Sequence, residues 1–323
     1  MDFDDDLRLE QTYAIPVAQG EKAAVRKYAC YHTSRDYPET ELMPRSRDLL
    51  DAARAEGFDA LAVRQAAYLA AFWQQADVEI DGDDLLQQGI RFNQYHLLQS
   101  VGRDGKTNIS AKGVTGEGYE GHYFWDTEIY IFPFFLYNKP EIARALLEYR
   151  WAGLESARRR ARQMSHAKGA LYPWRTIAGE ECSAYFPAGT AQYHINADIA
   201  YALAQYVAAT GDADFLMRAG VDILVETARM WADLGFWQDS EFHIHGVTGP
   251  DEYTTVVNDN LFTNVMARFN LAQAARAVRE LAQIDGPEYD ALVARLKLHD
   301  DEVSEWQRAA DAMAIPFDDF LGV

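Results

Sequence analysis

Apolar positions change their spacing along the chain near residue 38. Before that point, residues 12–17 and 25–31 look strand-like, but two such segments are too few to form a sheet with its own core. After it, apolar residues recur at the spacing of one face of a helix. The ranges with helical spacing are 39–76, 83–98, 126–136, 140–163, 192–209, 213–234, 258–284 and 288–312.

Three long connections interrupt this helical pattern, at 102–121, 169–189 and 245–253. They are polar and rich in aromatic residues, and they fall on one apparent side of the alternating helices. A simple helix bundle has short connections, so long loops at one end favour an α/α toroid. The sequence therefore predicts an all-α fold of this kind.

Composition narrows the classes of partner. With 323 residues, 49% of them apolar, the chain can bury a large core as one big domain or two ordinary ones. Its net charge of −20 argues against nucleic acid and anionic membranes as partners, because both require clustered Lys and Arg. The one basic run, Arg158–Arg160 with Arg162, is interpreted as a solvated helix face.

The cellular compartment is predicted from three features that the sequence lacks: a membrane-spanning stretch, a disulfide framework and a secretory signal. No apolar stretch is long enough to span a bilayer, since the run 60–73 carries Arg64 and Gln65. Two cysteines give neither a disulfide framework nor metal-ligand spacing. The first residues are acidic where a secretory signal would be basic and then apolar. We therefore expect a cytoplasmic protein.

The loop 245–253 contains two adjacent acids, Asp251 and Glu252, between a proline and a tyrosine. Its glycines and proline shape a turn between two predicted helices. Adjacent carboxylates repel, which drives one towards its protonated form, and a protonated carboxyl near neutral pH is what a general acid requires. The alternative is that both acids merely cap the following helix.

Two further loops carry aromatic and acidic residues. The segment 116–128 holds His122, Trp125 and Asp126, which suit a sugar because aromatic faces stack on rings and carboxylates accept from hydroxyls. Here the alternative is that Trp125 is core and Asp126 is a helix N-cap. The segment 171–190 holds Trp174 and Arg175, and an ion pair of Arg175 with one of the next acids, Glu180 or Glu181, is the simpler explanation of that arginine.

Together the three loops predict an acidic, aromatic-rich pocket. The sequence contains no phosphate-cradling Walker loop and no dinucleotide fingerprint. No histidine pair has zinc spacing on one helix, since His243 and His245 have strand spacing and flank a turn. We therefore predict no metal site.

These motifs resemble glycoside hydrolase family 65, the inverting disaccharide phosphorylases. The matching segments are 116–128, Trp174-Arg175-Thr176, Gly179-Glu180-Glu181-Cys182 and 248–253, and the resemblance covers essentially the whole chain. It implies an N-terminal β-sandwich, linker helices, an (α/α)6 catalytic barrel and a small C-terminal β domain. On this basis residues 1–37 are the tail of the β-sandwich, 38–80 the linker helices and 81–323 the first part of an (α/α)6 barrel (toroid).

The same resemblance implies roles for single residues. Glu252 is similar to the general acid of the family, and Trp125 and Asp126 to the residues that hold the glucosyl ring. The other candidate substrate-binding residues are His122, Trp174, Arg175, Glu181, His194 and Asn196. The segment 185–190 looks closer to kojibiose- and trehalose-type phosphorylases than to maltose phosphorylases.

The implied reaction is phosphorolysis of a kojibiose- or trehalose-like disaccharide to β-glucose 1-phosphate and a sugar. It needs no cofactor and no metal, and inorganic phosphate is the co-substrate. The full-length protein is expected to be a homodimer. The family's later segments that contact sugar and phosphate have no counterpart in these 323 residues, so we interpret the chain as the middle part of a larger phosphorylase and expect it to be inactive alone.

Two other functions stay open at the level of sequence. An inverting, trehalase-like hydrolase of the same fold would differ in having a second carboxylate in place of phosphate donors. A non-catalytic helical sugar-binding module would bind sugar without turnover. A partial barrel would expose apolar helix faces and is expected to self-associate or to be marginally stable.

Overall fold

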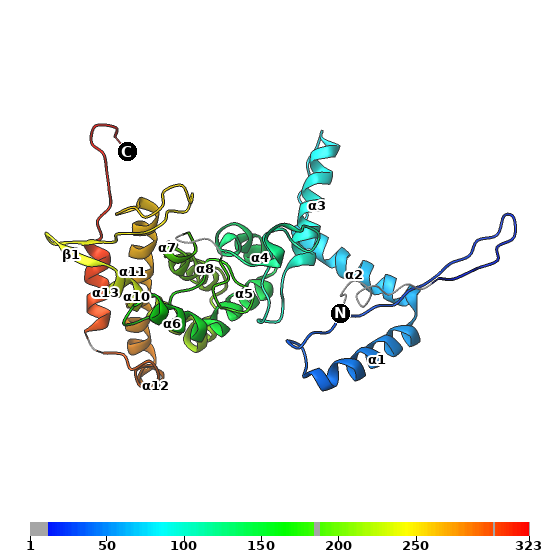
Figure 1. The fold of residues 1–323 in the computed structure, drawn as a ribbon, viewed down its shortest axis with the longest axis horizontal. Coiled ribbons are helices and arrows are strands. Elements are labelled where there is room, and N and C mark those ends of the chain that lie inside the picture. The colour runs from blue at the N-terminus through cyan, green and yellow to red at the C-terminus, as the bar shows by residue number, and fades with distance from the viewer. Residues whose placement is uncertain (1–11, 184–187, 300, 323) are drawn as a thin grey trace, which may run out of the picture. The chain divides into compact units, whose positions relative to one another are not determined.

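The structure is a computed structural model, described for residues 12–183, 188–299 and 301–322 (Figure 1). The chain divides into two compact units, Met1–Gln75 and Ala76–Val323. Within the described part, no helix combines the length and the apolar character needed to cross a membrane.

The first unit is helical after residue 38, as predicted. Helix α1 spans Glu39–Glu56 and α2 spans Phe58–Ala76, separated by Gly57 in the left-handed region at φ 86°. The strand-like pattern before them is not realised, because residues 12–37 contain neither strand nor helix. A strand is stable only when neighbouring strands satisfy its backbone groups, and the described part of this unit offers none.

The second unit is built almost entirely of helices, which confirms the predicted all-α class. Its only described sheet is the antiparallel pair β1 and β2, with Phe236 opposite His243. The elements are α3 (Asp84–Ser100), η1 (Gly118–Gly121), η2 (Thr127–Ile131), α4 (Phe132–Asn138), α5 (Pro140–Ala152), α6 (Leu154–Gln163), α7 (Ala188–Ala191), α8 (Ile195–Thr210), α9 (Ala213–Phe215), η3 (Leu216–Gly220), α10 (Val221–Leu234), β1 (Phe236–Gln238), β2 (Glu241–His243), α11 (Leu261–Ile284), α12 (Gly286–Leu296) and α13 (Glu302–Asp311).

Helix ends in this unit follow side-chain caps that can be recognised in the sequence. The Asp83 carboxylate accepts from Leu86 N and begins α3, and the Asp212 carboxylate accepts from Phe215 N and begins α9. Gly211 ends α8 in the left-handed conformation at φ 67°. The predicted stop and start around residue 211 are therefore confirmed, with the expected chemistry.

Several local features of the second unit differ from the prediction. The range 140–163 is two helices, since α5 ends at Gly153, whose N–H bonds to the carbonyls of Tyr149 and Arg150. The range 288–312 is also two helices, with α12 ending at Lys297 in the left-handed region at φ 50°. The hairpin of β1 and β2 was missed because its strands are three residues long and β1 is exposed throughout, leaving no alternation to detect.

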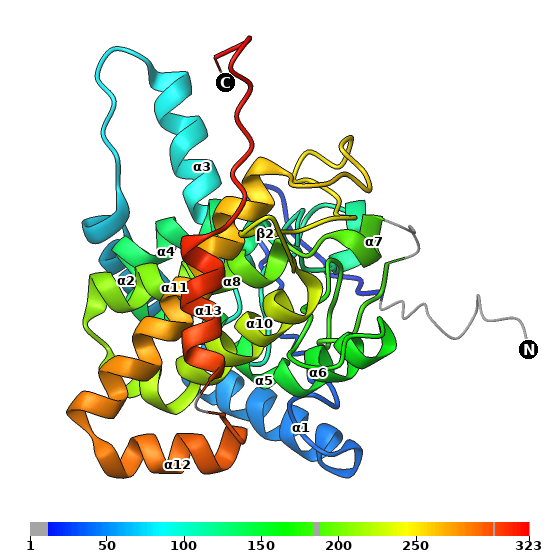
Figure 2. The same ribbon diagram turned by 90° about the vertical axis from the view of Figure 1, so that its left-hand side faces the viewer.

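The core of the second unit centres on α11, which packs against α13, α10 and α8 (Figure 2). The apolar side chains that face this contact are almost completely buried, among them Ile199, Val225, Trp231 and Leu271, whereas Leu261 and Ile284 at the two ends of α11 are exposed. Each fully buried side chain of this size contributes roughly 1.5–3 kcal/mol relative to exposure. This rigid helical body is the support from which the three long loops project.

The second loop, 171–190, leaves the core at a glycine that cannot be replaced without movement. A Cβ on Gly169 would lie 2.3 Å from Met230 N and 2.6 Å from Glu226 O, which are backbone atoms of α10. The next residue, Ala170, donates its N–H to Glu226 O at 2.9 Å. This close approach fixes where the second loop begins.

Candidate active site

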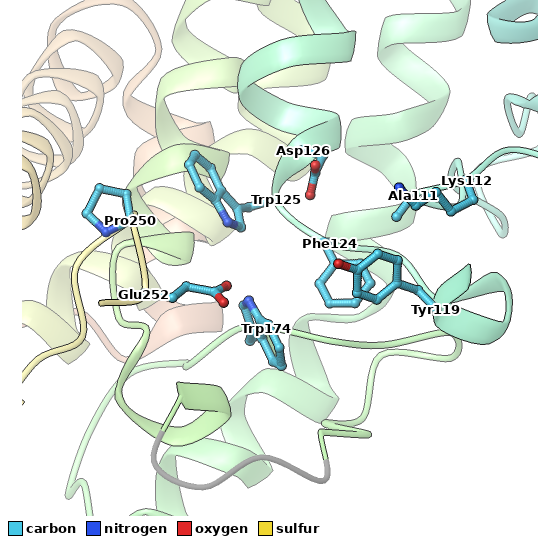
Figure 3. Close-up of a pocket in the computed structure, with 9 residues that line it drawn as sticks. All are labelled: Ala111, Lys112, Tyr119, Phe124, Trp125, Asp126, Trp174, Pro250 and Glu252. Atoms are coloured by element: carbon cyan, nitrogen blue, oxygen red, sulfur yellow. The ribbon is translucent and has the colours of Figure 1, made fainter. Parts of the chain in front are cut away.

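One cavity of about 640 Å³ collects residues from all three predicted loops (Figure 3). Its lining residues are Ala111, Lys112, Tyr119, Phe124, Trp125, Asp126, Trp174, Pro250 and Glu252. Figure 3 shows the carboxylates of Asp126 and Glu252 turned towards the interior of the cavity. The structure therefore brings Trp125, Asp126, Trp174 and Glu252 together, although their separations in sequence are large.

Glu252 is presented by the third loop, 245–253, which is closed at its base. Val247 pairs with Val257 through two backbone hydrogen bonds of 3.0 and 2.8 Å. A Cβ on Gly249 would lie 2.2 Å from Thr254 Oγ1, so a larger residue there would force the Thr254 side chain to move. Glu252 itself adopts a left-handed backbone with φ 59°, a conformation that non-glycine residues rarely keep without a constraint.

The helix-cap alternative for the two acids is wrong. The following helix, α11, begins only at Leu261, and its N-cap is Asn260, whose side chain accepts from Thr263 N. Asp251 and Glu252 lie eight or more positions before that helix begins. They belong to the loop itself.

The two acids have different surroundings. Asp251 accepts from the hydroxyl of Thr254 at 2.5 Å and from its amide at 3.2 Å, and these bonds lower the pKa of the Asp251 carboxyl. Asp251 is therefore ionised at neutral pH and is used inside its own loop. Glu252 instead faces the cavity and accepts a 3.1 Å hydrogen bond from Gln192 Nε2.

Behind Glu252 lies a chain of three buried polar side chains. Since Gln192 uses its Nε2 for Glu252, its Oε1 is the atom that accepts from His194 Nε2, at 3.1 Å. His194 Nδ1 lies 2.7 Å from Asp198 Oδ2, so one proton is shared between these two groups. His194 and Asp198 are 0% exposed and Gln192 is 2% exposed. The chain holds the Gln192 amide in one orientation towards Glu252.

Burial raises the pKa of the Asp198 carboxyl from 3.8 to about 6, an effect that its hydrogen bond from His194 only partly offsets. Between these two pH values the unfolded chain releases a proton that the folded protein keeps. This group therefore favours folding most at low pH, and its contribution decreases by about 3 kcal/mol as pH rises from about 4 to 6.

We expect the Asp198→Asn variant to lose this dependence. Urea unfolding of both proteins from pH 4 to 7 should show the variant gaining about 3 kcal/mol relative to the parent across the window, because Asn has no proton to release. Comparing the two proteins cancels the titration of groups that do not contact Asp198. Parallel stability curves would contradict the assigned burial effect.

The first loop, 116–128, supplies Trp125 and Asp126. The Trp125 ring is 8% exposed, and its edge packs on the His194 ring with centroids 4.9 Å apart. Trp125 thus belongs both to the core and to the cavity wall. Asp126 is exposed and precedes η2, but its side chain makes no capping hydrogen bond.

A buried ion pair supports this loop from below. Arg150 donates to both Glu128 oxygens, at 2.7 and 2.9 Å, and each side chain is 2% exposed. Arg150 Nη2 also lies 3.5 Å from Phe124 O. Burial lowers the pKa of the Arg150 guanidinium, but the neighbouring Glu128 carboxylate offsets this and the pKa is raised overall, so Arg150 keeps its charge.

The second loop contributes Trp174 directly, whereas Glu181 organises the loop. The Glu181 carboxylate accepts from the backbone N–H groups of Trp174, Arg175 and Ser183 at 2.8–3.1 Å, and it pairs with Arg160. It does not line the cavity. Its hydrogen bonds indicate that it shapes the loop instead of contacting sugar.

Direct sugar contact by His194 and Asn196 does not fit the structure. Both side chains are 0% exposed. Asn196 accepts from Tyr172 N at 2.9 Å and donates to Ala170 O at 2.7 Å, which fastens the start of the second loop to α8. The two residues were grouped with the site because they follow a candidate loop, but the helix turns them inward.

His122 and Arg175 connect the first and second loops outside the cavity lining. Arg175 Nη2 donates to Glu120 Oε2 at 2.5 Å and lies 3.2 Å from His122 Nδ1. The predicted ion pair of Arg175 with Glu180 or Glu181 is therefore wrong. Those acids pair instead with Arg159 and Arg160, on α6.

Sequence reasoning missed several residues of this site. Lys112 and Tyr119 line the cavity, and Gln192 contacts Glu252. Glycines on both sides of Tyr119 were the available signal for close approach to a ligand, whereas nothing in the sequence singles out Gln192. The comparison drawn from 185–190 falls largely outside the described residues.

Comparison with known proteins agrees with this architecture. Residues 91–323 match the model of the "Glycosyl hydrolase family 65 central catalytic domain". The chain belongs to glycoside hydrolase family 65. Residues 2–72 match the model of the N-terminal domain of family 65. The predicted boundaries at 37 and 80 stay a prediction.

Two relatives within family 65 are phosphorylases by name. The chain is 53% identical over 308 residues to an alpha,alpha-trehalose phosphorylase of Thermoanaerobacter brockii, covering 94% of this chain and 40% of the relative. It is 37% identical over 300 residues to a kojibiose phosphorylase of Halothermothrix orenii, covering 88% and 38%. The chain thus spans about 40% of the length of the curated relatives it matches.

A solved family 65 structure has the same fold. It is a putative kojibiose phosphorylase from the human microbiome, with a TM-score of 0.79 and 29% sequence identity over 88% of this chain and 42% of that one. The predicted fold class, a helical (α/α)-type toroid, is confirmed by this similarity together with the helical architecture.

Proposed function

We propose that the protein catalyses inverting phosphorolysis of an α-glucosyl disaccharide, with Glu252 as the general acid. The observation that carries this proposal is the cavity in which Glu252 faces the two indoles and the second carboxylate. The products are β-glucose 1-phosphate and a sugar. Trehalose is the first substrate to test, since the relative at 53% identity is a trehalose phosphorylase.

The cavity has the groups that a sugar ring requires. Trp125 and Trp174 offer aromatic faces, and Asp126 offers an acceptor for hydroxyl groups. The Trp174 Nε1–H is buried and has no hydrogen-bond partner among the described residues. An unpaired buried donor is costly, so a sugar oxygen that accepts from it gains affinity.

The reaction needs one acid from this chain and a nucleophile on the opposite face of the sugar. Glu252 donates its proton to the glycosidic oxygen as the bond to the anomeric carbon breaks. Inorganic phosphate then attacks as an anion, so no second carboxylate is needed to activate it. Asp126 is assigned to hydroxyl binding for that reason.

The deciding test measures sugar release by the protein in its full natural length, with and without inorganic phosphate. With trehalose or kojibiose as substrate, we expect release only with phosphate, and β-glucose 1-phosphate by NMR. Equal sugar release without phosphate would show that the protein is a hydrolase and would overturn the proposal. Calorimetric binding of the sugar without release under either condition would replace it by a binding module.

A further inference from the structure

Two histidines and one aspartate converge at the base of the third loop. His243 ends β2 and His245 follows two residues later, whereas Asp259 lies beyond the other end of the loop, two residues after Val257. His243 Nδ1 lies 2.9 Å and His245 Nε2 lies 3.2 Å from the same oxygen, Asp259 Oδ2. All three potential ligand atoms lie within 4.8 Å of one another.

The Asp259 carboxylate is held in place by its other oxygen. Oδ1 accepts from Ile244 N and from Asn264 Nδ2, both at 3.1 Å, which leaves Oδ2 for the two imidazoles. Asp259 also keeps a left-handed backbone at φ 46°. Metal ligands are typically oriented by such outer hydrogen bonds, and strained backbone is typically kept where it positions a group.

An aromatic wall and partial exposure complete the surroundings. The Phe236 ring stacks on His243, with centroids 5.8 Å apart, and meets the His245 ring edge-on at 4.7 Å. The side chains of His243, Asp259 and His245 are 17%, 22% and 38% exposed. The group is therefore shielded on one side and reachable from solvent.

Two chemistries are compatible with this geometry. In the first, each imidazole donates an N–H to Asp259 Oδ2, and the three side chains form a hydrogen-bonded group. In the second, one divalent ion replaces both protons and is bound by two nitrogens and one oxygen. Imidazole and carboxylate are preferred ligands of Zn²⁺ and its neighbours, and bound ligands at about 2.0–2.2 Å from the ion lie roughly 3–3.5 Å apart.

We propose that His243, His245 and Asp259 form a binding site for a divalent transition metal ion, with Zn²⁺ as the expected ion. Its place next to the Val247–Val257 bridge means that the ion joins the two ends of the third loop. None of the three residues lines the cavity, so the ion stabilises the loop and takes no part in the chemistry. The proposal stands whether or not the protein is a phosphorylase.

The sequence prediction of no metal site relied on spacing along one helix. His243 and His245 have strand spacing, and the third ligand comes from beyond the loop. Only the closure of the loop brings them together. The site is therefore a property of the tertiary structure.

The test uses chelator-treated protein and titrates it with Zn²⁺ by calorimetry and with Co²⁺ by visible absorption. One equivalent should bind, with the d–d bands of a Co²⁺ ion bound by nitrogen and oxygen. His245→Asn and Asp259→Asn should abolish binding, and Asn264→Ala should weaken it by roughly 10–100-fold. His166→Asn is the matched control, since His166 also pairs with an aspartate, Asp233 at 3.1 Å, but among the described residues forms no group with a second histidine.

A melting measurement shows whether the variants are folded. Without metal, His245→Asn should unfold at the same temperature as the parent, because His245 is partly exposed. With Zn²⁺, the parent and His166→Asn should shift to a higher melting temperature, Asn264→Ala should shift less, and His245→Asn should not shift. Absence of a one-to-one complex in the parent, or binding that survives both His245→Asn and Asp259→Asn, would overturn the proposal in favour of the hydrogen-bonded group.

Discussion

The Glu252→Gln variant is expected to slow phosphorolysis by roughly 10²–10⁴-fold, the contribution typical of a general acid. Glutamine keeps the shape of the side chain and can still hydrogen-bond to Gln192, but it has no proton to give to the leaving oxygen. The measurement is the initial rate with trehalose and phosphate, in the protein in its full natural length. Thermal unfolding of the variant should match the parent, since Glu252 is exposed.

Asp251→Asn is the matched control for this prediction. It removes the same charge from the adjacent position, and Asn can still accept from Thr254. We expect its rate to stay close to that of the parent, because Asp251 is used inside its own loop. Equal losses in both variants would show that loop charge matters and would refute a specific role for Glu252.

A change of substrate separates proton donation from simple positioning. Glucosides with activated leaving groups need little protonation, so their turnover should suffer much less from Glu252→Gln than turnover of the disaccharide. A positioning defect would slow both substrates alike. This comparison makes the assignment of the general acid independent of the size of the rate loss.

The Glu128→Gln variant is expected to destabilise the fold by about 3–5 kcal/mol, the typical cost of leaving one member of a buried ion pair unpaired. Arg150 would keep its charge at 2% exposure without a carboxylate beside it. Chemical denaturation followed by tryptophan fluorescence measures the loss. Its consequence at the site is expected to be displacement of Phe124, whose carbonyl lies beside Arg150 Nη2.

Two further variants separate the contribution of the buried Glu128–Arg150 ion pair from other effects on stability. Glu280→Gln breaks an exposed pair with Arg276, whose side chains are 55% and 62% exposed, and should cost under about 0.5 kcal/mol. Replacing both buried partners, as in Glu128→Leu with Arg150→Met, should recover most of the stability, since neither charge then lacks a partner. A Glu128→Gln loss no larger than that of Glu280→Gln would contradict the importance of the buried pair.

Much of the helical framework could be predicted because its signals are local. Asp83, Asp212 and Asn260 are caps that act within three residues, and apolar spacing identifies the faces of α8, α10 and α11. The break at Gly153 was missed because a glycine with helical angles leaves the apolar period undisturbed. The end of α12 was missed because it depends on a left-handed backbone at Lys297, a conformation that the sequence does not predict for lysine.

The site was predicted less completely, because its geometry depends on which way helices turn their side chains. The four residues Trp125, Asp126, Trp174 and Glu252 share a cavity, and they were identified by resemblance together with residue chemistry. His194 and Asn196 begin a helix whose first turn faces the core, which no local pattern around them reveals. The contact of Gln192, the residue after α7, with Glu252 in the third loop likewise exists only in three dimensions.

The packing of Trp125 on His194 limits how this protein can acquire a new substrate. A smaller residue at 125 would enlarge the pocket, but it would also loosen the imidazole that orients Gln192 and, through it, Glu252, the proposed proton donor. A substitution at position 125 that widens substrate selectivity is therefore expected to lower the turnover rate. Lys112 and Tyr119 line the same cavity but take no part in this line of contacts, so under the proposed function we expect substitutions there to change specificity with less effect on the rate.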